Sequence, residues 1–261
     1  MQSSVLKELL ENQYLKYKRK FSSKDPVWVL HEFQDARDIE IAGLITSAYA
    51  YGRVEQINKF IKRLFSDIGG NPYEFTINFK KRKDKKYLKG FKYRFNSESD
   101  IISLFDVINR NLVKHGSLKN LFLSGYHCND DNIINALTNF SRSLSLKNNS
   151  INKYYHYLVA NPANNSTCKR MNLFLRWMVR KDEIDLGVWN EVSPSKLIMP
   201  VDTHIARISK KLKLVKRKTL DLKFAVELTK RLKKFDGNDP VKYDFALCHL
   251  GIDKEEIMNN E

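Results

Sequence analysis

The chain has 261 residues, 42% of them hydrophobic and 11% aromatic, which is enough for a packed core and excludes a mainly disordered chain. Lysine and arginine number 46 against 30 acidic residues, so the net charge is +16. This charge favours a polyanionic partner, with nucleic acid as the leading candidate. Binding to a membrane surface is the weaker alternative, because the charges are spread along the chain.

Several classes of protein and of site are excluded by what the sequence lacks. No apolar run is long enough to span a bilayer, and residues 1–20 lack the apolar centre of a signal peptide. Three widely spaced cysteines (Cys128, Cys168 and Cys248) give neither a disulfide framework nor a Cys-x-x-Cys metal site, and a four-cysteine iron–sulfur cluster cannot form within one chain. We expect a soluble, reduced, cytoplasmic protein with no cofactor and no metal.

Apolar residues at helical spacing predict an all-α fold. The predicted helices cover residues 5–19, 38–51, 53–68, 99–111, 118–123, 131–144, 168–180, 202–212, 221–234 and 241–250. Asp38 is the expected N-cap of the second helix, and Gly69-Gly70 is expected to end the third. Short strands are expected only near residues 74–79. Polar loops are predicted at 147–152 and 161–166, and a polar connection at 181–196.

The densest basic run is FKKRKDKKYLKGFKYRF, residues 79–95, in which aromatic residues alternate with lysine and arginine. A surface that contacts phosphates and stacks bases has this composition. A solvated charged face whose aromatic residues enter the core has the same composition. The sequence leaves both interpretations open.

Two stretches carry candidate chemistry: NPANNSTCKRMNLFLRWMVRKD (residues 161–182) and MPVDTHIARISKKLKL (residues 199–214). In the first, a polar turn leads into a helix that starts near Lys169. The positive end of the helix dipole and the neighbouring Arg170 both favour a neutral, nucleophilic amine. Asp202 begins the helix of the second stretch and would supply a carboxylate. The plainer interpretations are a solvated lysine and a structural N-cap.

PVDTHIARI, residues 200–208, resembles the signature of the helix-hairpin-helix DNA glycosylases, the superfamily of endonuclease III and eukaryotic 8-oxoguanine glycosylase. The resemblance implies that Lys169 is the Schiff-base lysine and Asp202 the catalytic aspartate. It also implies a two-lobed helical architecture, with residues 1–44 and 205–261 in lobe one and residues 45–204 in lobe two. The chain is most similar to a bacterial family distantly related to the archaeal 8-oxoguanine DNA glycosylases.

The sequence departs from the family pattern in two ways, and the resemblance implies roles for further residues. The hairpin reads NPANNS where relatives have glycines, although asparagine can adopt left-handed geometry. The connection between Lys169 and Asp202 is longer than in endonuclease III and resembles that of the archaeal enzymes. By resemblance, the base pocket would use Asp244, Cys248, Phe174 and Trp177. The DNA-contacting residues would be Tyr49, Tyr51, Arg53, Asn164, Asn165, Ser166, Arg170, His204 and Arg207.

We therefore expect a monomeric base-excision-repair enzyme that acts on damaged double-stranded DNA and is associated with the bacterial nucleoid. It would release a damaged purine, with 8-oxoguanine as the best choice, and nick the strand through its AP lyase activity. The alternatives are a monofunctional glycosylase for alkylated purines and a non-catalytic protein that binds DNA or RNA. Core packing is a competing role for Phe174 and Trp177, and a buried or capping carboxylate is one for Asp244.

Overall fold

The computed structural model describes residues 3–19, 21, 24–146 and 154–250. Over these ranges the protein is all-α: it contains helices and no strand, and two isolated bridges pair Tyr93 with Asn96 and Lys181 with Leu186. Across the same ranges, no helix is both long and apolar enough to cross a membrane. The loop predicted at 147–152 lies outside the described residues.

The chain divides into two compact units. Unit 1 comprises Met1–Ser23, Asp131–Ile133 and Pro162–Glu261, and unit 2 comprises Lys24–Asp130 and Ile134–Asn161. These boundaries differ from the lobes that the resemblance implied, which were divided at residues 44 and 204. The reason is that Arg176, in the helix after residue 168, and Arg180, its C-cap, form ion pairs with Asp244 and Asp239, so that this helix belongs with the C-terminal helices.

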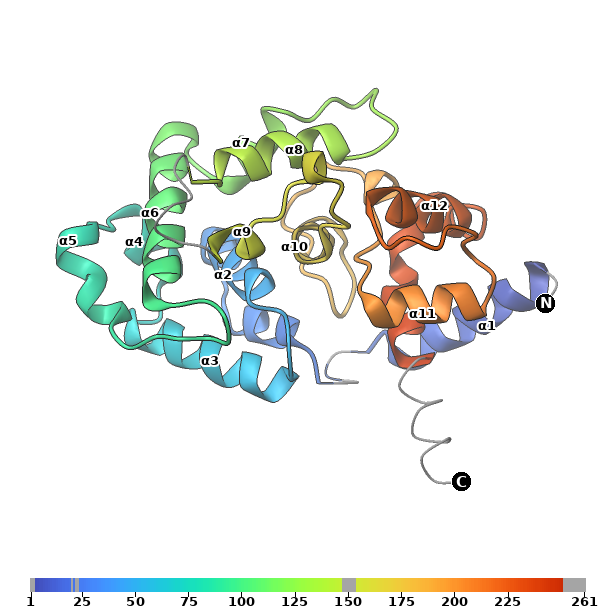
Figure 1. The fold of residues 1–261 in the computed structure, drawn as a ribbon, viewed down its shortest axis with the longest axis horizontal. Helices are drawn as coiled ribbons and strands as arrows, with labels where there is room; N and C mark the ends of the chain where they lie inside the picture. The colour runs from blue at the N-terminus through green and yellow to red at the C-terminus, as the bar shows by residue number, and fades with distance from the viewer. Residues whose placement is uncertain (1–2, 20, 22–23, 147–153, 251–261) are drawn as a thin grey trace. The chain divides into compact units, whose positions relative to one another are not determined.

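Unit 2 contains the helices between residues 26 and 158 (Figure 1). They are η1 (Pro26–Glu32), α2 (Ala36–Ala48), α3 (Val54–Asp67), α4 (Pro72–Ile77), α5 (Lys81–Asp84), η2 (Lys85–Leu88), α6 (Glu98–His115), α7 (Leu118–Leu123), α8 (Ile134–Ser143) and α9 (Tyr155–Leu158). Helix α2 is its central element, because every residue from Ile39 to Ala48 is buried, and it packs against η1, α4 and α7.

Unit 1 contains the blue α1 and the helices from residue 162 onward, which include the orange and red helices of Figure 1. They are α1 (Ser3–Tyr17), η3 (Pro162–Asn164), α10 (Lys169–Val179), η4 (Pro194–Lys196), α11 (Thr203–Lys211), α12 (Leu222–Leu232) and η5 (Pro240–Tyr243). Residues 244–250 continue η5 as an α-helix. Helix α10 is buried on all sides from Met171 to Val179 and forms the core of this unit.

Two predictions about local structure are wrong. Asp38 does not cap α2: the cap is Asp35, whose Oδ1 accepts a hydrogen bond from the N–H of Arg37 at 2.8 Å. Asp38 instead accepts one from the N–H of Tyr73 at 2.8 Å and so joins α2 to α4. The strands expected near residues 74–79 are replaced by α4, which begins at Pro72, a residue that suits the first turn of a helix.

The other predicted helices are present, with end points shifted by a few residues. Helix α3 ends before Gly69 and Gly70, which both have positive φ, as expected. Helix α6 continues four residues further than predicted, to His115, and stops at Gly116 with φ of 80°. Helix α8 starts at Ile134 and not at residue 131.

Candidate active site

The turn before α10 uses left-handed backbone at two non-glycine residues, Asn165 with φ of 56° and Cys168 with φ of 49°. The sequence analysis expected asparagine to take this geometry, and Asn165 does so. Its N–H donates to the carbonyl of Pro162 at 2.9 Å, and its carbonyl accepts from the N–H of Leu222 at 3.1 Å. These bonds hold the turn against the start of α12, so the turn reaches α10 with a defined backbone path.

Cys168 is the residue at which the turn becomes the helix. Its backbone N–H donates to Oγ of Ser166 at 3.1 Å, and its side chain is buried. Burial raises the pKa of the Cys168 thiol to about 12. The neutral Cys168 side chain therefore packs in the core as a small apolar group. Lys169 follows it as the first residue of α10, where the unpaired amides of the first turn give the helix a positive end.

Asp202 is the N-cap of α11, as the sequence predicts. Its Oδ1 accepts a hydrogen bond from the N–H of Ile205 at 2.9 Å. The approach to this cap is fixed by the buried residues before it, and the N–H of Met199 donates to Oγ1 of Thr229 at 3.0 Å. The position of the carboxylate is therefore set by both α11 and α12.

The structure brings Lys169 and Asp202 together although they are far apart in the sequence. Nζ of Lys169 lies 3.4 Å from Oδ2 of Asp202, and each side chain is 33% exposed. The pair is thus partly shielded but reachable from solvent. An amine and a carboxylate in this arrangement can orient one another and face an electrophilic carbon.

A third candidate, Asp244, is buried and forms an ion pair with Arg176. Burial raises the pKa of the Asp244 carboxyl, and the carboxylate of Asp202 adds to the rise. The charges of Arg176 and Lys169 act in the opposite direction. All four side chains therefore share one electrostatic environment.

A buried charge network that was not predicted from the sequence surrounds Asp185. Arg176 on α10 and Arg180, the C-cap of α10, both bind the fully buried Asp185. Arg180 also binds Asp182 at 2.9 Å and Asp239 at 2.9 Å. Desolvation raises the pKa of Asp185 to about 6, and the two guanidinium groups oppose that rise. Two arginines at i and i+4 in an otherwise apolar helix were the signal in the sequence.

One comparison with known proteins gives a match. The profile of the family described as "Protein of unknown function (DUF2400)" matches residues 25–253, which is most of the chain. This protein belongs to that family. Searches among curated proteins and among solved structures found no match. The matched range includes Lys169, Asp202 and Asp244, so the whole candidate site is part of the family's domain.

The candidate base-pocket residues take different positions in the structure. Phe174 and Trp177 are fully buried, and the ring of Phe174 packs edge-on against Trp189 with centroids 5.3 Å apart. Both residues therefore have the core-packing role that helical spacing suggested. Cys248 is half-buried, one turn after Asp244 in the closing helix.

The candidate DNA-contacting residues of unit 1 lie around the two helix starts. Asn164 and Asn165 are exposed in the turn before α10, and His204 and Arg207 are exposed on α11. Ser166 and Arg170 are half-buried on either side of Lys169. The backbone N–H groups at the first turn of a helix, together with nearby polar and basic side chains, are suited to binding a phosphate group.

The candidates of unit 2 lie in the loop between α2 and α3, but only Arg53 is exposed. Tyr49 is buried and stacks at an angle on Phe60 with centroids 4.8 Å apart. The hydroxyl of Tyr51 donates to Oδ1 of Asn96 at 2.6 Å. Tyr49 is therefore a core residue, and Tyr51 is held in place by the segment around Tyr93.

Over the residues that the structure describes, no group of three or more histidine, cysteine, aspartate or glutamate side chains is arranged to hold a metal ion.

Proposed function

We propose that this protein is a DNA glycosylase with AP lyase activity that removes a damaged purine, with 8-oxoguanine as the best candidate. The observation that carries the proposal is the 3.4 Å separation between Nζ of Lys169 and Oδ2 of Asp202. The resemblance gives these two residues a joint role, and their closeness in space supports it. The turn and α10 would then form the hairpin and helix of a two-lobed helix-hairpin-helix architecture.

In the proposed reaction, Lys169 as the free amine attacks C1′ of the damaged nucleotide. A bond forms between Nζ and C1′ while the bond from C1′ to the purine nitrogen breaks, and the base leaves with that electron pair. The proton lost from Nζ neutralises the departing base. Asp202 stabilises the positive charge that develops on the sugar and orients the amine.

The lyase step follows from the covalent intermediate. Opening of the sugar ring converts the adduct into an imine between Nζ and C1′. Removal of a proton from C2′ then expels the 3′ phosphate and breaks the bond between C3′ and oxygen. Water finally hydrolyses the imine and releases the lysine.

Several features support duplex DNA as the substrate. The net charge of +16 favours a polyanion, and Arg170 and Arg207 lie on the helices that carry Lys169 and Asp202. A base inside a duplex is inaccessible to Nζ, so the reaction requires the damaged nucleotide to be extruded from the helix. The exposed turn at Asn164 and Asn165 offers a phosphate contact beside that extruded nucleotide.

The proposal is tested by borohydride trapping on duplexes that carry 8-oxoguanine, uracil, an alkylated purine or an abasic site. We expect a covalent adduct on the 8-oxoguanine duplex that Lys169→Gln abolishes while DNA binding is retained. Lys223→Gln, at an exposed position on α12, is the matched control and should trap like the wild type. Normal cleavage by Lys169→Gln would refute the assignment, and an adduct at the abasic site alone would refute the substrate.

A second candidate is favoured by the exposure of Asp202, whose side chain is 33% exposed and can be reached by a water molecule. In that case Asp202 would act on water or on the sugar cation, and the enzyme would be a monofunctional glycosylase for alkylated purines. Base release without an adduct or a nick identifies this reaction. Salt-dependent binding without base release identifies a non-catalytic nucleic-acid-binding protein.

A further inference from the structure

The basic segment of residues 79–95 lies in unit 2, and the structure separates its aromatic residues into two groups. Phe79, Phe91 and Tyr93 are buried, whereas Tyr87 is 43% exposed and Phe95 is 61% exposed. All nine cationic side chains of the segment are exposed: Lys80, Lys81, Arg82, Lys83, Lys85, Lys86, Lys89, Lys92 and Arg94. The segment is therefore an anchored surface with two aromatic rings left on the outside.

The anchoring explains why these charges stay close together. Oδ2 of Asp84 accepts a hydrogen bond from the N–H of Lys80 at 2.7 Å, which closes the turn before α5. Leu88 is fully buried, and the N–H of Gly90 donates to Oε2 of Glu98 at 2.7 Å. Apolar burial and these bonds hold the backbone, so the cluster of like charges is kept in place by the rest of unit 2.

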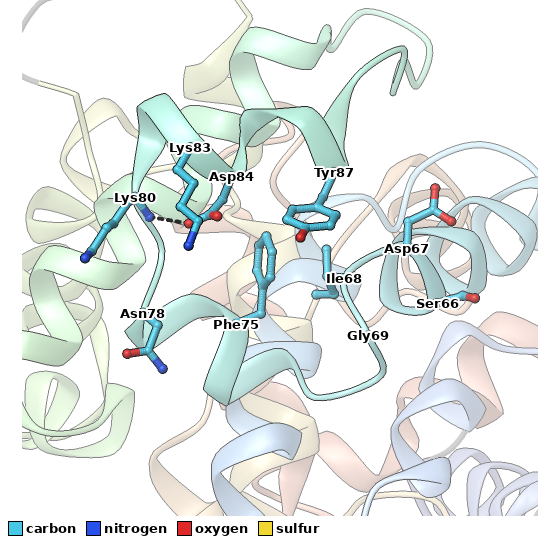
Figure 2. Close-up of a pocket in the computed structure, with 10 residues that line it drawn as sticks. All are labelled: Ser66, Asp67, Ile68, Gly69, Phe75, Asn78, Lys80, Lys83, Asp84 and Tyr87. Atoms are coloured by element: carbon cyan, nitrogen blue, oxygen red, sulfur yellow. Dashed lines mark hydrogen bonds between the residues drawn. The ribbon is translucent and has the colours of Figure 1, made fainter.

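A pocket of about 510 Å³ opens beside this segment, lined by α4, α5, η2 and the end of α3 (Figure 2). The ring of Phe75 meets the ring of Tyr87 edge-on, with centroids 6.0 Å apart. Figure 2 shows Lys80, Lys83 and Asp84 on one side of these rings and Asp67 on the other, so that two cations and one carboxylate share the first side. The volume lies within the range of small-molecule sites, about 300–1,000 Å³.

We infer that this pocket binds one nucleotide of a nucleic-acid strand. Its phosphate lies at Lys80 and Lys83, and its base stacks on the exposed ring of Tyr87. Asp67, on the far side of the rings, accepts hydrogen bonds from the N–H groups of a base. The order of cations, aromatic rings and acceptor across the pocket matches the order of phosphate, base and base edge in a nucleotide.

A nucleotide within a strand fits better than a free nucleotide, because the cations continue beyond the pocket. Lys81, Arg82, Lys85 and Lys86 are exposed next to it and do not line it. They provide contacts for neighbouring phosphates, which a free nucleotide lacks. The inference does not depend on the proposed glycosylase reaction, because Lys169 and Asp202 belong to unit 1.

The test measures binding of a fluorescently labelled single-stranded DNA 12-mer to the full chain by anisotropy. Tyr87→Ala should weaken binding about tenfold or more, and Tyr87→Phe should restore it. Tyr157→Ala, at a tyrosine of unit 2 that is 49% exposed and lies outside the pocket, is the matched control and should bind like the wild type. Thermal unfolding of each variant verifies that the fold is intact.

The phosphate contact has its own readout, the slope of log binding constant against log salt. The double variant Lys80→Ala/Lys83→Ala should lower that slope by about 1.4, since each single-strand phosphate contact contributes about 0.7. Lys59→Ala/Lys114→Ala removes the same charge at exposed positions outside the pocket and should change the slope less. Adenosine monophosphate should compete far more weakly than an unlabelled strand at equal nucleotide concentration.

Wild-type affinity in Tyr87→Ala would overturn the inference, as would competition by the mononucleotide as strong as by the strand. The glycosylase proposal and the pocket proposal can be refuted independently of each other. Absence of borohydride trapping with Tyr87-dependent binding refutes only the glycosylase reaction. Normal trapping at an abasic site in Tyr87→Ala, with unchanged strand binding, refutes only this pocket.

Discussion

The two carboxylate oxygens of Asp202 have different partners, and one of them is Lys169. Oδ1 caps α11 by accepting the N–H of Ile205 at 2.9 Å, while Oδ2 lies 3.4 Å from Nζ of Lys169. The structural and the chemical interpretation of this aspartate are therefore compatible, because each uses a different atom. Substitutions at Asp202 can therefore test the capping role and the chemical role separately.

Asp202→Asn should keep the cap and lose the charge, because asparagine caps a helix as well as aspartate does. Its melting temperature should stay close to that of the wild type, while base release slows on the order of a hundredfold. Asp202→Ala should also lose about 1 kcal/mol of stability with the cap. Thermal unfolding and single-turnover base release provide the two measurements. Equal loss of stability in both variants would contradict the division of roles.

Arg176→Met should destabilise the protein by about 3–5 kcal/mol, because it leaves two buried carboxylates with one fewer cation. Those carboxylates are Asp185, whose side chain is fully buried, and Asp244. Lys223→Met, at an exposed position on α12, is the control and should change stability little. Urea unfolding measures both, and a variant as stable as the control would show that the network is not needed for folding.

The stability contributed by Asp221 should depend on pH. The ion pair with Arg217, the N–H of Phe224 and the amide of Asn165 hold the pKa of Asp221 below its usual value. A lowered pKa in the folded state stabilises the protein fully above the unfolded value of about 3.9, and this contribution is lost progressively as the pH falls from there through the lowered folded pKa. The difference in melting temperature between wild type and Asp221→Asn should therefore be constant near pH 7 and shrink steadily as the pH falls below about 4. A difference that is constant with pH would contradict the assignment.

Cys168 should resist alkylation in the folded protein. Its thiol is buried and its pKa is raised to about 12, so the reactive thiolate is scarce at pH 8. Cys128 is exposed and should react with iodoacetamide under the same conditions. Peptide mass mapping after labelling, with and without urea, distinguishes the two. Rapid labelling of Cys168 without urea would show that the turn before α10 opens readily.

Local patterns in the sequence predicted the positions of most helices. Apolar spacing placed α3, α7, α10, α11 and α12 within a few residues of their true ends, because a helix depends on contacts between near neighbours. The cap at Asp202 was predictable for the same reason, as was a left-handed residue in the turn at Asn165.

Local sequence patterns could not decide which of two nearby aspartates caps a helix, or whether one segment forms a strand or a helix. Asp35 and Asp38 are both plausible caps in the sequence, and the packing of α4 against α2 decides that Asp38 binds the N–H of Tyr73. The segment of residues 74–79 has aromatic residues that suit a strand or a helix. Its contacts with α2 and α6 favour the helix.

Composition and periodicity were enough to predict a helical and strongly basic chain, and local motifs pointed to Lys169 and Asp202. Packing of the chain brings these two side chains together, pairs Arg176 with Asp185 and Asp244, and leaves Tyr87 exposed while Phe79 is buried. The difference follows from the range of the interactions. Helical periodicity reflects residues three or four positions apart, whereas an ion pair or a buried ring depends on segments that only the packing of the chain brings together.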